Sequence, residues 1–195
     1  MGEAKLKKSR LHRILQVQPF CIYCGGATLG ETVDHMPPVT MFDRRQRPQG
    51  LEFVACLPCN KGSALTDQVV GYFSRVYPDP RSEAAKDEAQ KIIAAIANNH
   101  PGLLEEMLPS VRQKHVYRRH RQALPHDAGG VLNAGGPLVN AQMQRFGAKL
   151  GLAMHFEETG RIVPSAGAIA VRWYSNFDRI TESIPDDLVT LLGRD

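Results

Sequence analysis

The chain has 195 residues and a formal net charge of +4. Of its residues, 43% are hydrophobic, a fraction typical of folded domains, and this composition excludes a chain that is disordered throughout. No apolar run approaches the roughly 20 residues that cross a bilayer, and residues 1–18 lack the apolar segment of a secretory signal. We therefore expect one or two small domains in a soluble, cytoplasmic protein that has no membrane partner.

Basic residues gather in three runs, at residues 5–13, 44–47 and 111–121, and the first run belongs to a predicted basic N-terminal helix over residues 1–19. Clustered lysine and arginine side chains attract phosphate backbones, although any single run is more often a solvated helix face. Two of the runs lie beside or within the cysteine-rich region, which favours a nucleic acid as the partner. The basic side chains expected to contact it are Arg44, Arg45, Arg47, Lys61, Arg118 and Arg119.

The four cysteines form two C-x-x-C pairs, Cys21 with Cys24 and Cys56 with Cys59. A C-x-x-C turn presents both sulfurs to one cation, so two such turns predict a four-thiolate zinc site whose closed shell makes the zinc structural. Disulfides, buried thiols or a redox motif are the alternatives, and a reducing compartment disfavours the disulfides. The 31 residues between the pairs exceed the roughly 15–20 of common zinc ribbons, so a further element lies between them.

The residues between and after the cysteine pairs predict a hairpin followed by a helix. The β-branched residues of "ETVDH" (31–35), which ends close to a proline pair, predict one strand, and "LEFVAC" (51–56) predicts a second. Apolar residues at positions 65, 69, 70, 73 and 76 then recur with helical spacing. The expected fold class is therefore α+β, with the zinc site clamping the base of a strand–strand–helix unit.

These motifs together resemble the zinc-bearing HNH endonucleases, also called ββα-metal or His-Me finger nucleases. The resemblance rests on "CIYC", "DHMPP" and "CLPCNKG" and covers about residues 20–76. The Asp-His pair and the asparagine directly after the fourth cysteine are also similar to those of phage Holliday-junction resolvases. The resemblance implies an endonuclease that hydrolyses phosphodiester bonds in duplex or branched DNA.

The resemblance also implies a role for each of three residues. His35 would be the general base that deprotonates the attacking water, a task that suits an imidazole because it exchanges protons near neutral pH. Asp34 and Asn60 would hold a catalytic Mg²⁺ or Mn²⁺ through oxygen atoms. That cation would stabilise charge on the scissile phosphate and on the leaving 3′ oxygen.

The sequence departs from the family pattern at two positions. Leu51, followed by Glu52, stands where the family has a central asparagine that orients the base, so a backbone carbonyl or Glu52 would have to hold His35. Asn60 replaces the final histidine of the family motif. Asp67 follows Asn60 by seven residues, about two helical turns. It is either a weak candidate for a third metal contact or a DNA-facing acid, or an ordinary solvated aspartate.

We expect the nuclease core to cover residues 20–78. A mainly helical accessory region over residues 79–195 follows it. Helix formers fill the segment that ends at Asn99, and apolar residues recur with helical spacing from 138 to 154. The composition of residues 168–176, "AIAVRWYSN", indicates a strand. The basic run at 111–121 indicates a helix or arm on phosphates or, equally, a solvated linker helix.

Three functions follow from these patterns, in order of preference. The first is the metal-dependent endonuclease. The second is a zinc-stabilised nucleic-acid-binding module without catalysis, which the missing central asparagine motivates. The third is a protein-interaction scaffold whose basic runs serve only solubility. The sequence leaves the oligomeric state open, a homodimer included.

Overall fold

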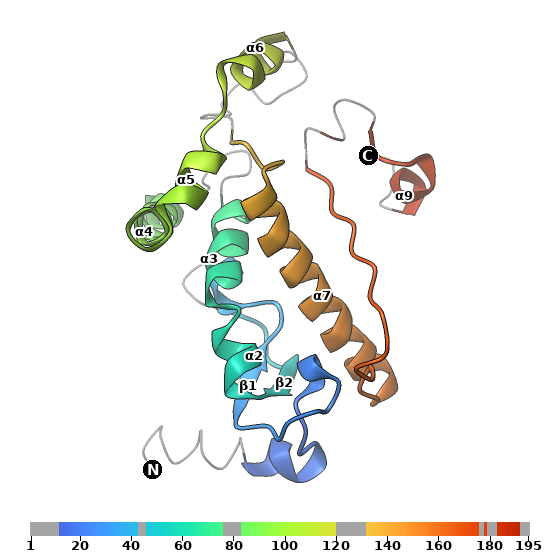
Figure 1. Ribbon diagram of the computed structural model, residues 1–195. Helices are drawn as coiled ribbons and strands as arrows, with labels where there is room; N and C mark the ends of the chain where they lie inside the picture. The colour runs from blue at the N-terminus through green and yellow to red at the C-terminus, as the bar shows by residue number, and fades with distance from the viewer. Residues whose placement is uncertain are drawn as a thin grey trace.

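A computed structural model of the chain describes residues 12–42, 46–75, 83–119, 132–175, 178 and 183–191. The fold is α+β, with one two-stranded sheet and a larger helical part (Figure 1). Residues 12–17 are helical. The further elements, in chain order, are η1 (Ile22–Cys24), β1 (Thr32–His35), η2 (Val39–Met41), β2 (Glu52–Ala55), α2 (Leu57–Lys61), α3 (Ala64–Phe73), α4 (Glu83–Asn99), α5 (Pro101–Met107), α6 (Val111–Arg119), α7 (Pro137–Thr159) and α9 (Asp186–Leu191).

The predicted hairpin is confirmed, with β1 and β2 antiparallel and Asp34 opposite Phe53 in the register. Three consecutive residues of β2, from Phe53 to Ala55, are buried. Because successive side chains of a strand point to opposite faces, this run of buried residues means that both faces of the hairpin are covered. The helix predicted after the fourth cysteine is present as α3, and the short helix α2, which contains that cysteine, precedes it.

Close contact between η2 and α3 fixes the loop that follows β1. Gly71 of α3 makes this approach possible, because a Cβ there would lie 2.7 Å from the Cβ of Thr40. The buried Arg75 guanidinium donates to the carbonyls of Thr40, Gly71 and Phe42, the last two at 2.8 Å. One side chain therefore satisfies carbonyl groups of both segments and ties them together.

Four helices share the larger hydrophobic core. Its fully buried members come from α3, α4, α5 and α7, and they are Val69, Ile96, Leu103, Met107 and Val139. Glu106 of α5 caps the N-terminus of α7, since its carboxylate accepts hydrogen bonds from the backbone nitrogens of Leu138 (3.0 Å) and Val139 (2.7 Å). A carboxylate at this end of a helix satisfies orphan N–H groups and favours the helix dipole.

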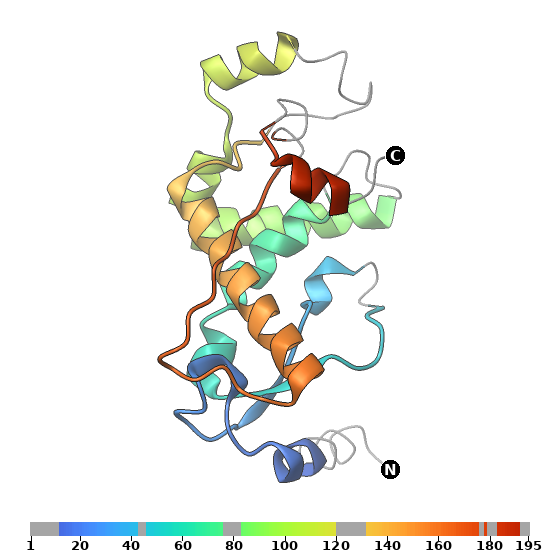
Figure 2. The same cartoon turned by 90° about the vertical axis from the view of Figure 1, so that its right-hand side faces the viewer.

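The long helix α7 also reaches the hairpin. In Figures 1 and 2 it runs from the helical core, past α3, to the end of the molecule that holds β1 and β2. Ala153 of α7 is buried in a second cluster with Ile22, Met36 and Phe53. The predicted accessory region therefore supplies one wall of the hairpin's own core. No helix in the described ranges is both long and apolar enough to span a membrane.

The prediction of a strand at residues 168–176 is wrong for the part that the structure describes, residues 168–175. This segment has no strand partner and instead runs extended along α7 (Figure 1). Val171 lies against Gly147, where a Cβ would come within 2.3 Å of it, and Trp173 Nε1 donates to Asn140 Oδ1 at 2.9 Å. The strand-like composition serves packing against a helix, and a helix offers no edge with which a strand can pair.

Replacing Arg75 by methionine should lower the free energy of unfolding by about 2–4 kcal/mol, because the three carbonyls lose their buried donor. Urea unfolding followed by circular dichroism measures this change. The control is Arg145→Met, since Arg145 is exposed and donates only to the Gly62 carbonyl at 2.9 Å, and we expect a change within about 0.5 kcal/mol. Equal effects of the two substitutions would contradict the role given to Arg75.

Candidate functional site

The structure brings the four cysteines together at the base of the hairpin. Cys21 and Cys24 lie at η1, and Cys56 and Cys59 lie at the start of α2. All four are free thiols, and their sulfur atoms lie within 4.8 Å of one another. A tetrahedral zinc ion with Zn–S bonds of about 2.3 Å needs sulfurs about 3.8 Å apart. The cluster can therefore hold a metal such as zinc with only small adjustments.

Electrostatics favour a cation among these sulfurs. Burial raises the pKa of the Cys59 thiol, and its contacts with Cys56 and the charge on Cys21 raise it further. Several thiolates this close repel one another unless a positive charge lies between them. The Thr28 hydroxyl lies 3.2 Å from the Cys24 sulfur and can orient it. Glu31 accepts a hydrogen bond from the Leu57 backbone nitrogen at 3.2 Å and holds the first turn of α2.

Asp34 points into the protein and forms an ion pair. Its Oδ2 lies 2.7 Å from the Lys149 Nζ of α7, and both side chains are only 8% exposed. Lys149 Nζ also donates to Ser63 Oγ at 2.7 Å and sits 4.8 Å from the centre of the Tyr23 ring. Burial raises the pKa of the Tyr23 phenol, and the negative charge of Asp34 raises it further.

Asp67, the weak candidate for a metal contact, lies in the first turn of α3. Burial raises the pKa of its carboxyl to about 6, an effect that the positive charge of Lys149 opposes and the charge of Asp34 reinforces. Asp67 is therefore electrostatically coupled to the pair formed by Asp34 and Lys149, and it is not an ordinary solvated aspartate. The ammonium of Lys149 thus interacts with two carboxyl groups, those of Asp34 and Asp67.

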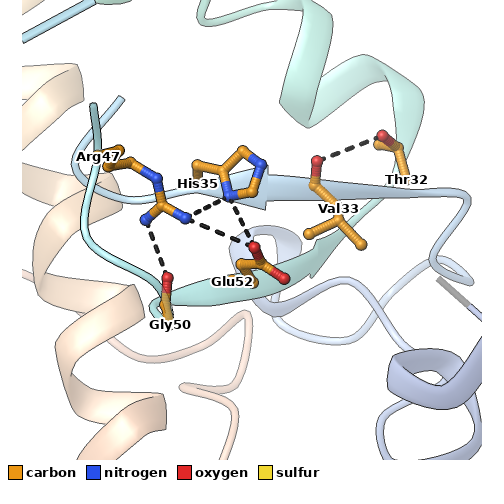
Figure 3. A network of polar contacts seen from close by, with 6 residues as sticks. All are labelled: Thr32, Val33, His35, Arg47, Gly50 and Glu52. Atoms are coloured by element: carbon orange, nitrogen blue, oxygen red, sulfur yellow. Dashed lines mark hydrogen bonds and ion pairs between the residues drawn. The ribbon is translucent and has the colours of Figure 1, made fainter. Parts of the chain in front are cut away.

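His35 meets a different set of partners, which Figure 3 shows. Its Nδ1 lies 2.8 Å from Arg47 Nη2 and 3.5 Å from Glu52 Oε1, and Arg47 Nη2 lies 3.5 Å from the same Glu52 oxygen. Arg47 also donates to the Gly50 carbonyl at 2.9 Å. The His35 side chain is 43% exposed, whereas those of Arg47 and Glu52 are 9% and 8% exposed. The imidazole is thus partly exposed to solvent, whereas the two charged side chains that contact it are buried.

The contact with Arg47 indicates which nitrogen of the His35 ring carries the hydrogen. A guanidinium has donors only, so Nδ1 of His35 is the acceptor and Nε2 carries the hydrogen of the neutral ring. Glu52 is the cross-strand partner of His35, which places its carboxylate beside the imidazole. Of the two holders expected for His35, a backbone carbonyl or Glu52, the structure provides Glu52 and adds Arg47.

Leu51 has a backbone conformation that is unusual for a leucine. Its backbone has a positive φ of 51°, in the left-handed region where asparagine is enriched and leucine is uncommon. Its side chain packs on the cluster that contains Met36 and Phe53. The Leu51 side chain therefore fills the core, and Glu52, the next residue, lies beside the His35 ring together with Arg47.

Asn60, in α2, is oriented by β1. Its Nδ2 donates to Thr32 Oγ1 at 3.1 Å. The amide oxygen, which is the acceptor of the same side chain, therefore points away from Thr32. Thr32 and Asp34 are two residues apart in β1, and their side chains share a face of the strand at a spacing of about 6.6 Å. The structure therefore gathers Asn60 and Asp34 at one face of the hairpin.

The predicted nucleic-acid contacts do not form one patch in the described part of the chain. Arg47 is at the site, and Lys61 is exposed at the end of α2. Arg118 and Arg119 are exposed on α6, which lies at the opposite end of the molecule from the hairpin in both views (Figures 1 and 2). Arg44 and Arg45 lie outside the described residues.

Sequence reasoning missed Lys149 and Ser63. Lys149 follows Phe146 by three residues and directly precedes Leu150, so it falls within the apolar stripe of its helix. A charged residue within such a stripe signals a buried partner of opposite charge, because a lysine is almost never fully buried unless it is paired. Ser63 carried no signal of its own.

No family model, curated protein or solved structure matches this chain. The case for a function therefore comes from the residues and from their geometry. That geometry establishes a four-cysteine cluster able to bind a metal and, at the other end of the hairpin, two neighbouring residues with separate polar surroundings.

Purified protein should contain about one zinc ion per chain, and Cys59→Ser should lose it, because a hydroxyl is a poor zinc ligand. The hairpin base then loses its organising centre, and the melting temperature should fall. Elemental analysis and thermal unfolding measure the two effects. The matched variant Cys59→His keeps a zinc ligand and should retain the metal. Unchanged zinc content in the serine variant would contradict a four-cysteine site.

Proposed function

We propose that the chain is a metal-dependent endonuclease of the HNH type that hydrolyses phosphodiester bonds in DNA. The observation that carries this proposal is the placement of His35: it emerges half-exposed from the end of β1, held between Arg47 and Glu52. Asp34 precedes it, and Asn60 lies over the same hairpin. The cysteine cluster at the hairpin base supports the zinc-bearing form of this nuclease class.

His35 would act as the general base through Nδ1, the ring nitrogen that carries the lone pair. Arg47 occupies this nitrogen in the structure, so the guanidinium has to turn away before Nδ1 can take a proton from water. A phosphate is the natural competitor, since guanidinium binds phosphate oxygens in a charge-assisted, bidentate manner. Binding of the DNA backbone by Arg47 would therefore release the base and anchor the substrate beside it.

Glu52 would then stabilise the charged ring. Once Nδ1 has taken the proton, the imidazolium stands 3.5 Å from the Glu52 carboxylate, which is nearly excluded from solvent. Attraction between opposite charges at this distance favours the protonated ring and keeps it in one orientation. Glu52 thus takes over the task of the family's central asparagine and adds a negative charge to it.

Asp34 and Asn60 offer a carboxylate and an amide oxygen, which are the donors that Mg²⁺ and Mn²⁺ prefer. A cation bound there would supply positive charge for the scissile phosphate and the leaving 3′ oxygen. In the structure Asp34 holds the ammonium of Lys149 instead, so these donors fit a divalent cation in kind but require an exchange of partners. Zinc at the cysteines stays structural, because four thiolates leave no open position.

A second candidate function is a zinc-stabilised nucleic-acid-binding module without catalysis. The engagement of both Asp34 and His35 by basic side chains favours it, since neither residue is poised for chemistry as it stands. The module would bind DNA through Arg47 and through the exposed basic residues of α2 and α6. It would bind in a salt-dependent manner and cleave nothing.

Wild-type protein with Mg²⁺ or Mn²⁺ should cleave plasmid, branched or single-stranded DNA, and His35→Ala should lower the rate by a factor on the order of 10²–10⁴, the usual contribution of a general base. Gel assays of the three substrates measure the rates. His155→Ala is the control, because His155 is exposed on α7, and it should cleave at the wild-type rate. Wild-type cleavage no faster than that of His35→Ala on every substrate would favour the binding module.

Glu52→Gln should lower kcat by roughly tenfold to a hundredfold with little change in KM, because the carboxylate stabilises the ring only after the proton has moved. Steady-state kinetics on the best substrate separate the two constants, and zinc content with circular dichroism verifies the fold. Glu157→Gln, on the exposed part of α7, serves as the control. An unchanged kcat in a folded Glu52→Gln protein would remove Glu52 from the mechanism.

A further inference from the structure

Lys149 carries a buried ammonium group in the centre of the proposed site. It comes from α7, and the residue as a whole is only 6% exposed. Its three neighbours are a carboxylate oxygen of Asp34 at 2.7 Å, the hydroxyl of Ser63 at 2.7 Å and the face of the Tyr23 ring at 4.8 Å. A carboxylate, a hydroxyl and an aromatic face together form a binding site for a cation.

The ammonium also links the two elements that carry the proposed metal ligands. Lys149 Nζ donates to Ser63 Oγ, and that hydroxyl donates in turn to the backbone carbonyl of Asn60 at 2.9 Å. The other contact of Nζ is Asp34 on β1. A continuous chain of polar contacts therefore runs from Asp34 through Lys149 and Ser63 to Asn60. The ammonium therefore connects Asp34 of β1 with the backbone of Asn60 in α2, the two residues that would share the cation.

Charge around the ammonium favours a second positive charge. The carboxyls of Asp34 and Asp67 both act on Lys149, whose single charge neutralises at most one of them. Lysine is a compact point charge on a flexible stem, so its ammonium can exchange for another small cation without a change of backbone. A divalent ion would balance both carboxyls.

We propose that Lys149 is the resident cation of this site: its ammonium holds Asp34 in place in the free protein, and a divalent cation reaches Asp34 only by displacing it. Lys149 is then a positioning residue that sets the affinity of the proposed nuclease for its divalent ion. The inference rests on the proposed function, because it concerns the cation that Asp34 and Asn60 would hold. A merely structural ion pair makes the opposite prediction, since its loss would loosen the site and weaken binding of the ion.

The test measures binding of Mn²⁺ alone, without DNA, to zinc-loaded protein by electron paramagnetic resonance of the unbound ion. Lys149→Met removes the competing charge at similar volume, so it should bind Mn²⁺ about tenfold or more tightly than the wild type. Lys149→Arg keeps the charge and should stay close to the wild type. Lys91→Met, at an exposed position of α4, is the control for removing a lysine and should change nothing.

Adding Asp34→Asn to Lys149→Met should abolish the gain, which assigns the bound ion to Asp34. Affinity in a folded Lys149→Met protein that equals or falls below that of the wild type would overturn the role of Lys149. Absence of bound Mn²⁺ in both proteins at millimolar concentrations would overturn the cation site itself, and with it both this inference and the metal-dependent nuclease. The two failures are therefore distinguishable.

A second measurement uses the wild-type protein and does not depend on how the variant folds. The buried ammonium of Lys149 should give a slowly exchanging ¹⁵Nζ resonance, because it is shielded from solvent, paired with Asp34 and donates a hydrogen bond to Ser63. Titration with Mg²⁺ should shift or remove this resonance at the same concentrations at which the Asp34 carboxyl carbon responds. A ¹⁵Nζ resonance that stays constant while the Asp34 carbon shifts would show that no exchange occurs and would overturn the inference.

Discussion

The joining of residues 21–24 to residues 56–59 is the constraint on which the rest of the structure depends. Each strand of the hairpin has only four residues, and a two-stranded hairpin of this size is at most marginally stable in water. The cysteine cluster closes the end of the hairpin where Ala55 and Thr32 pair. Metal binding at four thiolates is worth enough free energy to organise such a segment. The opposite end, with Asp34 and His35, is placed by this closure together with the hydrophobic cluster around Met36 and Phe53.

The long helix α7 supplies the second constraint. It contributes Val139 to the helical core and Ala153 to the cluster beneath the hairpin, so the two cores are held on one rigid rod. Lys149 lies between these contacts and reaches Asp34. A change in how α7 packs would therefore move Lys149 relative to Asp34 at the proposed cation site. In this way residues more than a hundred positions apart in the chain share one polar cluster.

The local elements of the site could be predicted from the sequence because their signals are local. The two C-x-x-C pairs, the β-branched residues before the proline pair and the helical spacing after Cys59 each report on neighbours in the chain. The strand expected at residues 168–176 failed because composition alone does not reveal whether an edge is available for pairing. The place of Lys149 in an apolar stripe signals a buried partner, but the identity of that partner depends on how α7 docks, and no spacing rule encodes that docking.

The two neighbouring residues of the site share one electrostatic condition. Asp34 is paired with Lys149, and the acceptor nitrogen of His35 is covered by Arg47, so each of the two side chains lies against a positively charged one. In the proposed nuclease, a DNA phosphate competes for Arg47 while a divalent cation competes for Asp34. These two ligands carry opposite charges and would meet at the same scissile group, so each favours binding of the other. In the proposed nuclease, neither exchange alone would complete the site, and the base would be uncovered only when the phosphate that the activated water is to attack is present.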